Sequence, residues 1–250
     1  MSGFRLLEGK TAVITGCNRG IGKAVLETFV AHGAGVFACT RRETAAFSEF
    51  TRLLSEKHSV TIIPLYFDAS NTTELKTAVK QIAASGLPVD VLVNNAAIGY
   101  NALFQMSPPG KLKEVFEINF FSPFILTQYL VKFMVRQKSG SIINISSTAG
   151  MDGNEGQSVY GASKAAMICW TKVIAAEFAK SGIRANSIAP GMTGTDMILC
   201  IPEVIRGKIP TGGVKRIGQP SDIAATALFL ASDLSAHISG QVIRVDGGLP

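Results

Sequence analysis

The fold is decided by residues 11–33, which read TAVITGCNRGIGKAVLETFVAHG. The first five residues form a short apolar run, which predicts a buried β-strand. A glycine-rich turn follows, and then a helix that ends at Gly33. The apolar residues of this helix share one face: Ile21, Val25, Phe29 and Val30. The stretch therefore predicts a strand, a tight turn and an amphipathic helix in direct succession.

The same alternation continues to the end of the chain. Six further apolar strands are expected at residues 35–40, 60–67, 89–95, 141–147, 183–190 and 240–248. Helices are expected at about 43–58, through Leu75, Val79 and Ile82, at 112–137, at 158–182, and from Ser221 and Asp222 as N-cap residues after Pro220. Strands that are apolar on both faces and alternate with helices predict a parallel sheet covered on both sides.

No linker, repeat or change of composition interrupts this alternation, so residues 1–250 are expected to form a single domain. Right-handed crossovers then favour a doubly wound α/β fold with seven strands in the order 3-2-1-4-5-6-7. Hydrophobic residues make up 47% of the chain and charged residues 17%, as in a folded globular protein.

The charge and cysteine content exclude several classes of function. The net charge is +6, but the lysines and arginines are scattered, which does not favour nucleic-acid binding. The four cysteines lie far apart, so neither a metal site nor a disulfide framework is expected, and all four are predicted to be buried free thiols: Cys17, Cys39, Cys169 and Cys200. With no signal peptide and no apolar run long enough to span a membrane, we expect a soluble cytoplasmic protein with no membrane partner.

The turn Thr15–Gly22 after the first strand has the glycine spacing G-x-x-x-G-x-G. Gly16 would permit the tight turn, Gly20 a close approach of the backbone to a phosphate, and Gly22 close packing of the helix on the strand. Such a turn can also serve only to start a helix. Its place between the first strand and an amphipathic helix favours a Rossmann-type dinucleotide site.

The end of the second strand indicates which dinucleotide the site would bind. It reads Cys39-Thr40-Arg41-Arg42 and lacks the carboxylate that usually accepts hydrogen bonds from the ribose hydroxyls of NAD. Arg41, with Arg19 beside the turn, would suit a 2′-phosphate, although both could be ordinary surface arginines. The prediction is NADP(H). Asp68, at the end of the third strand, could accept a hydrogen bond from the adenine amino group.

A possible chemical centre lies in the helix after the fifth strand. Tyr160 and Lys164 are four residues apart and share one helical face. Tyrosine has a pKa near 10, and a nearby ammonium would lower it and favour proton transfer. Ser147 could polarise a carbonyl oxygen beside them. Such a pair often occurs by chance, but here it accompanies the glycine-rich turn and the basic strand end.

Taken together, these motifs resemble the short-chain dehydrogenase/reductase family over essentially the whole chain. The family's T-G-x-x-x-G-x-G matches Thr15–Gly22, its N-N-A-G matches Asn94–Ala97 with Ala97 in place of glycine, and its P-G turn matches Pro190-Gly191. The resemblance implies a catalytic set in which Tyr160 is the acid in reduction and Asn119 holds a water that relays protons to Lys164: Asn119, Ser147, Tyr160 and Lys164. It also implies that Thr193 meets the nicotinamide carboxamide and that Thr195 bonds it or the phosphates.

The predicted cofactor contacts follow from the strand ends and this resemblance. They are Gly16, Asn18, Arg19, Gly20, Ile21, Gly22, Thr40, Arg41, Asp68, Ala69, Asn95, Ala96, Ala97, Tyr160, Lys164, Pro190, Gly191, Thr193 and Thr195.

Within the family, several stretches are most similar to the 3-oxoacyl-[acyl-carrier-protein] reductases of fatty acid biosynthesis, among them residues 153–157 and 209–213. This implies a small-molecule or carrier-bound ketone as substrate, and a homotetramer. Lys138 and Lys180 could meet an acidic carrier at the mouth of the site, although Ser181 stands where an arginine is expected. A substrate lid is expected at about residues 192–213; its apolar residues could cover an apolar substrate or pack only on the protein.

Three functions are compatible with these features. The first is an NADPH-dependent reductase of 3-oxoacyl thioesters. The second is a dehydrogenase of a sugar, a polyol or another secondary alcohol. The third is a regulator that binds NADP(H) without catalysis, because fold does not fix function; the complete set of catalytic residues argues against it.

Overall fold

The computed structural model describes residues 5–196 and 213–248. Its centre is a seven-stranded parallel sheet in the order β3-β2-β1-β4-β5-β6-β7. The strands are β1 Thr11–Thr15, β2 Gly35–Thr40, β3 Ile62–Tyr66, β4 Val91–Asn94, β5 Gly140–Ile145, β6 Ile183–Pro190 and β7 Val242–Val245. The predicted α/β class, strand number and strand order are confirmed.

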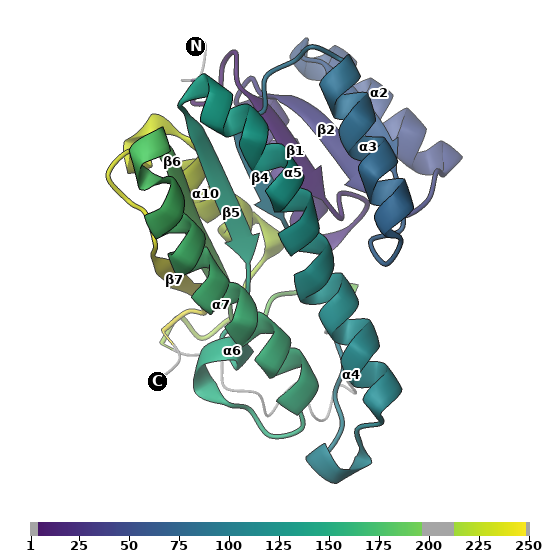
Figure 1. Cartoon of the computed structure of the whole chain (residues 1–250), viewed down its shortest axis with the longest axis vertical. Coiled ribbons are helices and arrows are strands. Elements are labelled where there is room, and N and C mark those ends of the chain that lie inside the picture. Colours follow the sequence, from purple (N-terminus) through teal and green to yellow (C-terminus); the bar gives the residue numbers. More distant parts are fainter. Residues whose placement is uncertain (1–4, 197–212, 249–250) are drawn as a thin grey trace.

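Helices cover both faces of the sheet, and Figure 1 shows α3, α5 and α7 in front of it and α10 behind. The α-helices are α1 Gly20–Ala31, α2 Ala45–His58, α3 Thr72–Ala84, α4 Pro109–Phe116, α5 Ser122–Gln137, α6 Ala149–Asp152, α7 Ser158–Phe178 and α10 Pro220–Ala231. Single 3₁₀ turns lie at Phe104–Met106, Ala179–Ser181 and Asp233–Ser235.

Each face of the sheet has its own hydrophobic core. Alternate residues of β1 point to opposite sides, so Ile14 packs with Phe29 of α1 in one core and Val13 packs with Leu130 of α5 in the other. All five residues of β1 are buried. This double burial explains why the strands read as continuous apolar runs.

The helix expected at residues 112–137 is interrupted in the structure. α4 ends at Phe116, and a π-helical turn, Glu117–Phe121, precedes α5. In this turn the Ser122 N–H donates to the carbonyl of Glu117, five residues earlier. Pro123 has no N–H and cannot donate to the carbonyl of Asn119, which removes one α-helical hydrogen bond at the interruption.

The start of α10 also differs from the prediction. Gln219 is the N-cap residue, and Asp222 is the third residue of the helix, where its carboxylate accepts the Gln219 backbone N–H at 2.7 Å. Ser221 is already inside the helix. Pro220 occupies the first helical position, which suits its fixed φ, and this places the cap one residue before it.

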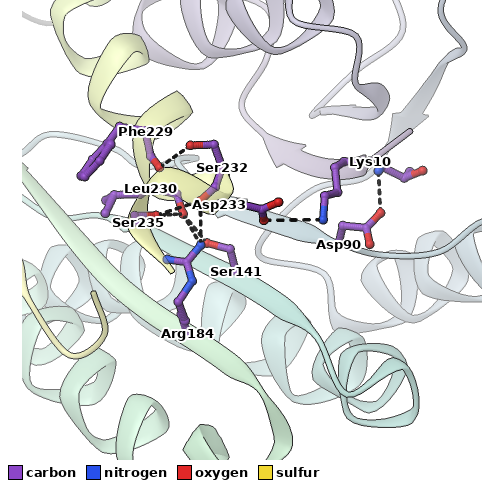
Figure 2. Close-up of polar contacts among 10 residues, drawn as sticks. Lys10, Asp90, Ser141, Arg184, Phe229, Leu230, Ser232, Asp233 and Ser235 are labelled. Carbon is purple, nitrogen blue, oxygen red and sulfur yellow. Dashed lines mark hydrogen bonds and ion pairs between the residues drawn. The ribbon is translucent and has the colours of Figure 1, made fainter. Parts of the chain in front are cut away.

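The opposite end of α10 is tied to the amino edge of the sheet (Figure 2). The Leu230 carbonyl accepts hydrogen bonds from Ser141 of β5 at 2.8 Å and from Arg184 of β6 at 2.8 Å. A half-buried guanidinium at a helix C-terminus satisfies carbonyls that have no intrahelical donor. These contacts fix α10 across two strands.

One expectation about buried residues needs correction. Cys17 and Cys39 are buried as expected, but Cys169 is exposed, and Cys200 lies outside the described residues. Among the described residues, one helical stretch, Pro109–Gln137, is long and apolar enough by length and composition to cross a membrane. It contributes Leu126 and Leu130 to the core beneath it, as central helices of globular domains do.

Candidate active site

The predicted site residues lie at the carboxyl edge of the sheet, where β1, β4, β5 and β6 end. The ends of β1 and β4 are bonded to each other. The Asn95 amide donates to the Thr15 carbonyl at 2.8 Å, and the Thr15 hydroxyl accepts the N–H groups of Asn95 and Ala96, each at 3.0 Å. This edge is where open α/β sheets bind ligands.

The glycines of the turn are required by close approaches to this edge. Gly16 has φ +73°, and a Cβ there would lie 2.8 Å from the Asn95 amide nitrogen. A Cβ at Gly22 would collide with the Gly16 carbonyl and the Asn95 amide. Gly22 therefore packs against the turn itself, and not against the strand as expected. A Cβ at Gly20 would lie 3.2 Å from the Thr195 methyl group.

The start of α1 is suited to a phosphate. Its N-cap residue, Arg19, makes no side-chain cap, so no capping side chain satisfies the N–H groups of the first turn. Together with the positive end of the helix dipole, these groups form an anion site, and the glycine turn leaves room for it. Residues Gly16 to Gly22 thus fit the pyrophosphate of a dinucleotide. The Arg19 guanidinium itself pairs with Asp196 at 3.3 Å.

The two residues predicted to bind the adenosine half are bonded to each other. The Arg41 Nε and Nη2 atoms lie 2.7 and 2.6 Å from the Asp68 Oδ2 atom. Hydrogen bonds from Ser70, and then the Arg41 charge, lower the pKa of Asp68. Arg41 remains 67% exposed, so it is accessible to an anion. The Thr40 hydroxyl is turned toward the Arg42 carbonyl, at 3.2 Å.

Three predicted catalytic residues meet between β5 and α7. The Ser147 side chain lies close enough to the Tyr160 phenol to lower its pKa. Lys164 is 2% exposed, and its ammonium donates to the Ile145 carbonyl at 2.8 Å. The Lys164 nitrogen lies 5.7 Å from the centre of the Tyr160 ring. The i,i+4 spacing on α7 and the end of β5 thus bring the phenol, the ammonium and the hydroxyl together.

Burial controls the ionisation of this group. It raises the pKa of Tyr160, and the Ser147 side chain lowers it to a lesser degree. The expected lowering of the Tyr160 pKa by Lys164 is therefore not found in the chain without its cofactor. Burial also lowers the pKa of Lys164 to about 8. In both residues the low-dielectric surroundings disfavour the charged form.

Asn119 is fully buried in the π-helical turn, and its side chain is engaged by protein groups. It accepts the Ile98 N–H at 2.9 Å and donates to the Ile98 carbonyl at 3.0 Å and to the Ser163 hydroxyl at 3.2 Å. The amide thus joins the loop after β4 to α7, next to Lys164. The water relay stays a prediction.

Comparison with known proteins agrees with this geometry. The profile of the short chain dehydrogenases matches residues 10–202. The chain belongs to this family. The chain is similar to the 3-oxoacyl-[acyl-carrier-protein] reductase of Thermotoga maritima, with 38% identity over 97% of this chain and 98% of that protein. It is also similar to a 3alpha-hydroxysteroid dehydrogenase of Mediterraneibacter gnavus, with 35% identity and 98% of each chain covered.

Solved structures of oxidoreductases superpose closely on the chain. One is a gluconate 5-dehydrogenase from Burkholderia cenocepacia in complex with NADP and tartrate, with a TM-score of 0.92, 29% identity, and coverage of 98% of this chain and 97% of that chain. The relatives therefore share the fold and the oxidoreductase class, and differ in the substrates that they are named for.

The chain also has buried polar contacts beneath the site that its sequence did not predict. The Asn94 amide donates to Thr127 at 2.9 Å and to Asn144 at 2.8 Å, and Asn144 donates to Thr171 at 2.8 Å. This buried ladder joins α5, β4, β5 and α7 beneath the site. Asparagines within otherwise apolar strands were the available signal: Asn94 was assigned to the fourth strand and to the N-N-A-G motif, but its bonds to other buried side chains were not predicted.

The remaining predicted cofactor contacts lie around the same edge. The Gly191 N–H donates to the Val245 carbonyl at 3.0 Å. Thr193 is buried, pairs with Gly218, and donates to the Gly191 carbonyl at 3.1 Å. Asn18 is exposed, whereas four others are partly buried: Ile21, Ala69, Ala97 and Gly191. Most of the expected lid, residues 197–212, lies outside the described residues.

The two lysines proposed to meet a carrier lie elsewhere. Lys138 caps the end of α5 just before β5, and Lys180 lies in the 3₁₀ turn just before β6. Both therefore lie at the amino edge of the sheet, opposite Ser147. They do not line the mouth of the site in the same chain, because helices α5 and α7 run antiparallel to the strands.

Proposed function

We propose that the chain is an NADPH-dependent reductase that transfers a hydride to a ketone, most similar to the 3-oxoacyl-[acyl-carrier-protein] reductases. The observation that carries this proposal is the meeting of Ser147, Tyr160 and Lys164 at the carboxyl edge, beside the glycine turn that fits a pyrophosphate. The named activity of the Thermotoga maritima relative supports the choice of substrate class.

In this proposal, Gly16 to Gly22 hold the pyrophosphate and Arg41 holds the 2′-phosphate. Asn95, Ala96 and Ala97 lie beside the nicotinamide ribose, and Thr193 beside the carboxamide. The bound cofactor supplies the hydride. The exposed guanidinium of Arg41, and the lack of a carboxylate at the end of β2, support NADP(H) over NAD(H).

Tyr160 is the proton donor in reduction. Because burial raises its pKa, the phenol is neutral at neutral pH and can donate its proton to the forming alkoxide. Ser147 orients the carbonyl oxygen through its hydroxyl. The Lys164 ammonium stabilises the phenolate that Tyr160 becomes, and Asn119 holds the adjoining loop in place. In oxidation the proton moves in the opposite direction.

A cofactor assay tests the proposal. Purified protein is mixed with NADPH and acetoacetyl thioester, and cofactor absorbance is followed. Oxidation of NADPH supports the 3-oxoacyl reductase. Oxidation only with ketones derived from sugars, polyols or steroids supports the second candidate, which the gluconate and steroid relatives favour. Tight binding of NADPH without turnover on any ketone would refute both and indicate a regulator. An equal or higher rate with NADH would refute the cofactor preference.

Tyr160→Phe tests the mechanism. The variant keeps the ring but lacks the proton, so kcat should fall by about 10²- to 10⁴-fold, while the Kd for NADPH changes by less than about twofold. Tyr129→Phe, which removes the same hydroxyl from a tyrosine on α5 outside the site, is the control for the chemical change. A variant that retains most of its kcat would rule out Tyr160 as the acid.

We also propose that four copies assemble and work in the cytoplasm, without a nucleic-acid or membrane partner. Supporting this, the outer faces of α5 and α7 carry apolar side chains that the single chain leaves exposed. Phe124 is 40% exposed and Val173 is 46% exposed. Pairing these helices across an interface would cover both side chains.

A further inference from the structure

Arg244 of β7 makes an ion pair that links distant parts of the chain. Its Nη1 and Nη2 atoms lie 2.8 and 2.9 Å from the two carboxylate oxygens of Asp152, which is 92 residues away. Its Nε atom lies 2.7 Å from Asp246. The guanidinium is thus held between two carboxylates with bidentate geometry, which lysine cannot reproduce.

Asp152 is the last residue of α6, the short helix that follows Ser147. The Asp152 N–H donates to the Thr148 carbonyl at 2.9 Å, and the Ala149 N–H donates to the Ser147 hydroxyl at 3.2 Å. A four-residue helix does not hold its shape alone, so its position depends on tertiary contacts. The position of Ser147 therefore depends on what holds α6.

On one side, α6 is packed tightly on α7. A Cβ at Gly150 would lie 2.7 Å from the Ala165 nitrogen, and a Cβ at Gly161 would lie 2.7 Å from the Ala149 carbonyl oxygen. Arg244 holds α6 from the side of β7. These two sets of contacts hold α6 between β7 and α7, and so support Ser147, which follows β5, opposite Tyr160 of α7.

The turn after β7 joins two more segments to the same point. The Val245 carbonyl accepts the Gly191 N–H at 3.0 Å, and the Gly247 carbonyl accepts the Val214 N–H at 3.0 Å. The strand end that carries Arg244 thus also holds the Pro190-Gly191 turn. These are backbone hydrogen bonds, so the strand end keeps its place when the Arg244 side chain is shortened, and what is lost is the contact with α6.

We propose that Arg244 is a positioning residue: through Asp152 it holds α6, and with it the Ser147 hydroxyl, in place opposite Tyr160. It touches neither the reacting atoms nor the cofactor. This inference rests on the proposed reductase function, and nothing in the mechanism above requires Arg244.

The test compares Arg244→Gln with Arg52→Gln. Arg52 also lies between two carboxylates, Glu49 and Glu56, but on the outer surface of α2. Arg244→Gln should lower kcat by about tenfold, because a displaced hydroxyl no longer meets the carbonyl oxygen, and leave the Kd for NADPH within about twofold. Arg52→Gln should leave both unchanged. Arg244→Lys keeps the charge without the bidentate geometry and should recover only part of kcat.

A second measurement separates positioning from general stability. If Arg244 acts through Ser147, then Arg244→Gln should cause no further loss of kcat in a Ser147→Ala background. A multiplicative loss in the double variant, or an unchanged kcat in Arg244→Gln, would overturn the proposal.

Hydrogen exchange of the peptide covering residues 148–157 provides a readout that needs no substrate. Exchange should be faster in Arg244→Gln than in the wild type and in Arg52→Gln. If the wild type reduces no ketone, the proposed function is wrong. Unchanged exchange of this peptide in Arg244→Gln would refute the positioning role of Arg244, whatever the outcome of the activity assay.

Discussion

Lys164 is a cation that the fold buries, and its ionisation is coupled to stability. Burial lowers its pKa from 10.5 to about 8, so between these values the unfolded chain binds more protons than the folded one. Stability contributed by this group therefore rises with pH from about 8 to 10.5, and below about 8 the buried charge carries its full cost. Lys164→Met should abolish turnover. The free energy of unfolding of the variant, relative to that of the wild type, should fall by about 2 kcal/mol as the pH rises from 7 to about 9.5, because only the wild type gains stability over this range.

Urea unfolding of both proteins at the two pH values measures this difference. Lys132→Met, at an exposed position on α5, is a control in which the difference should stay constant. A Lys164→Met difference that does not vary with pH would show that burial does not lower the pKa of Lys164 and that its ammonium stays charged in the folded chain over this range.

The Arg41 side chain is exposed to solvent and paired with Asp68. The exposure lets it reach a bound anion, and the ion pair competes with that anion for the guanidinium. Loss of its guanidinium in Arg41→Ala should weaken NADPH binding by about tenfold or more and change NADH binding little, because only NADPH carries the 2′-phosphate. Fluorescence titration with each cofactor gives the two Kd values. Equal weakening for both cofactors would mean that Arg41 acts only by holding Asp68.

At the scale of the element, the glycine turn and α1 act as one unit. Gly22→Ala places a methyl group against the Gly16 carbonyl and the Asn95 amide, which are backbone and buried groups that cannot yield easily. We expect a loss of about 2–4 kcal/mol of stability and a clear loss of NADPH affinity. Thermal unfolding and cofactor titration measure these effects.

Gly110→Ala is the matched control, because a Cβ there meets no atom within 4 Å. Since it lies within α4, it should stabilise the chain by up to about 1 kcal/mol. A Gly22→Ala protein as stable as this control would contradict the packing described for the turn.

At the scale of the whole molecule, the exposed apolar side chains on α5 and α7 bear on assembly. Light scattering should give a mass of four chains for the wild type. Val173→Glu places a charge on the proposed interface and should yield smaller species, because burying an unpaired carboxylate is unfavourable. Leu53→Glu is the control on α2, where the leucine is 51% exposed. A monomeric wild type would refute the tetramer.

The sequence alone determined the elements and their order. Central strands such as β1 and β4 were recognisable because they are buried on both faces and therefore apolar, and β1, β2 and β6 agree with their predicted bounds. The spacing of Tyr160 and Lys164 was likewise visible, because a helix places residues four apart on one face. Periodicity is a local property, so it can be interpreted without knowing what else touches the segment.

Only the tertiary structure decided the environment of those residues. The π-helical turn at Asn119 is joined to Ile98, Arg41 is paired with Asp68, and Arg244 meets Asp152 across 92 residues. The raised pKa of Tyr160 also comes from burial by several elements. Burial and electrostatic interaction depend on distances through space, and segments far apart in the chain acquire such distances only when it folds.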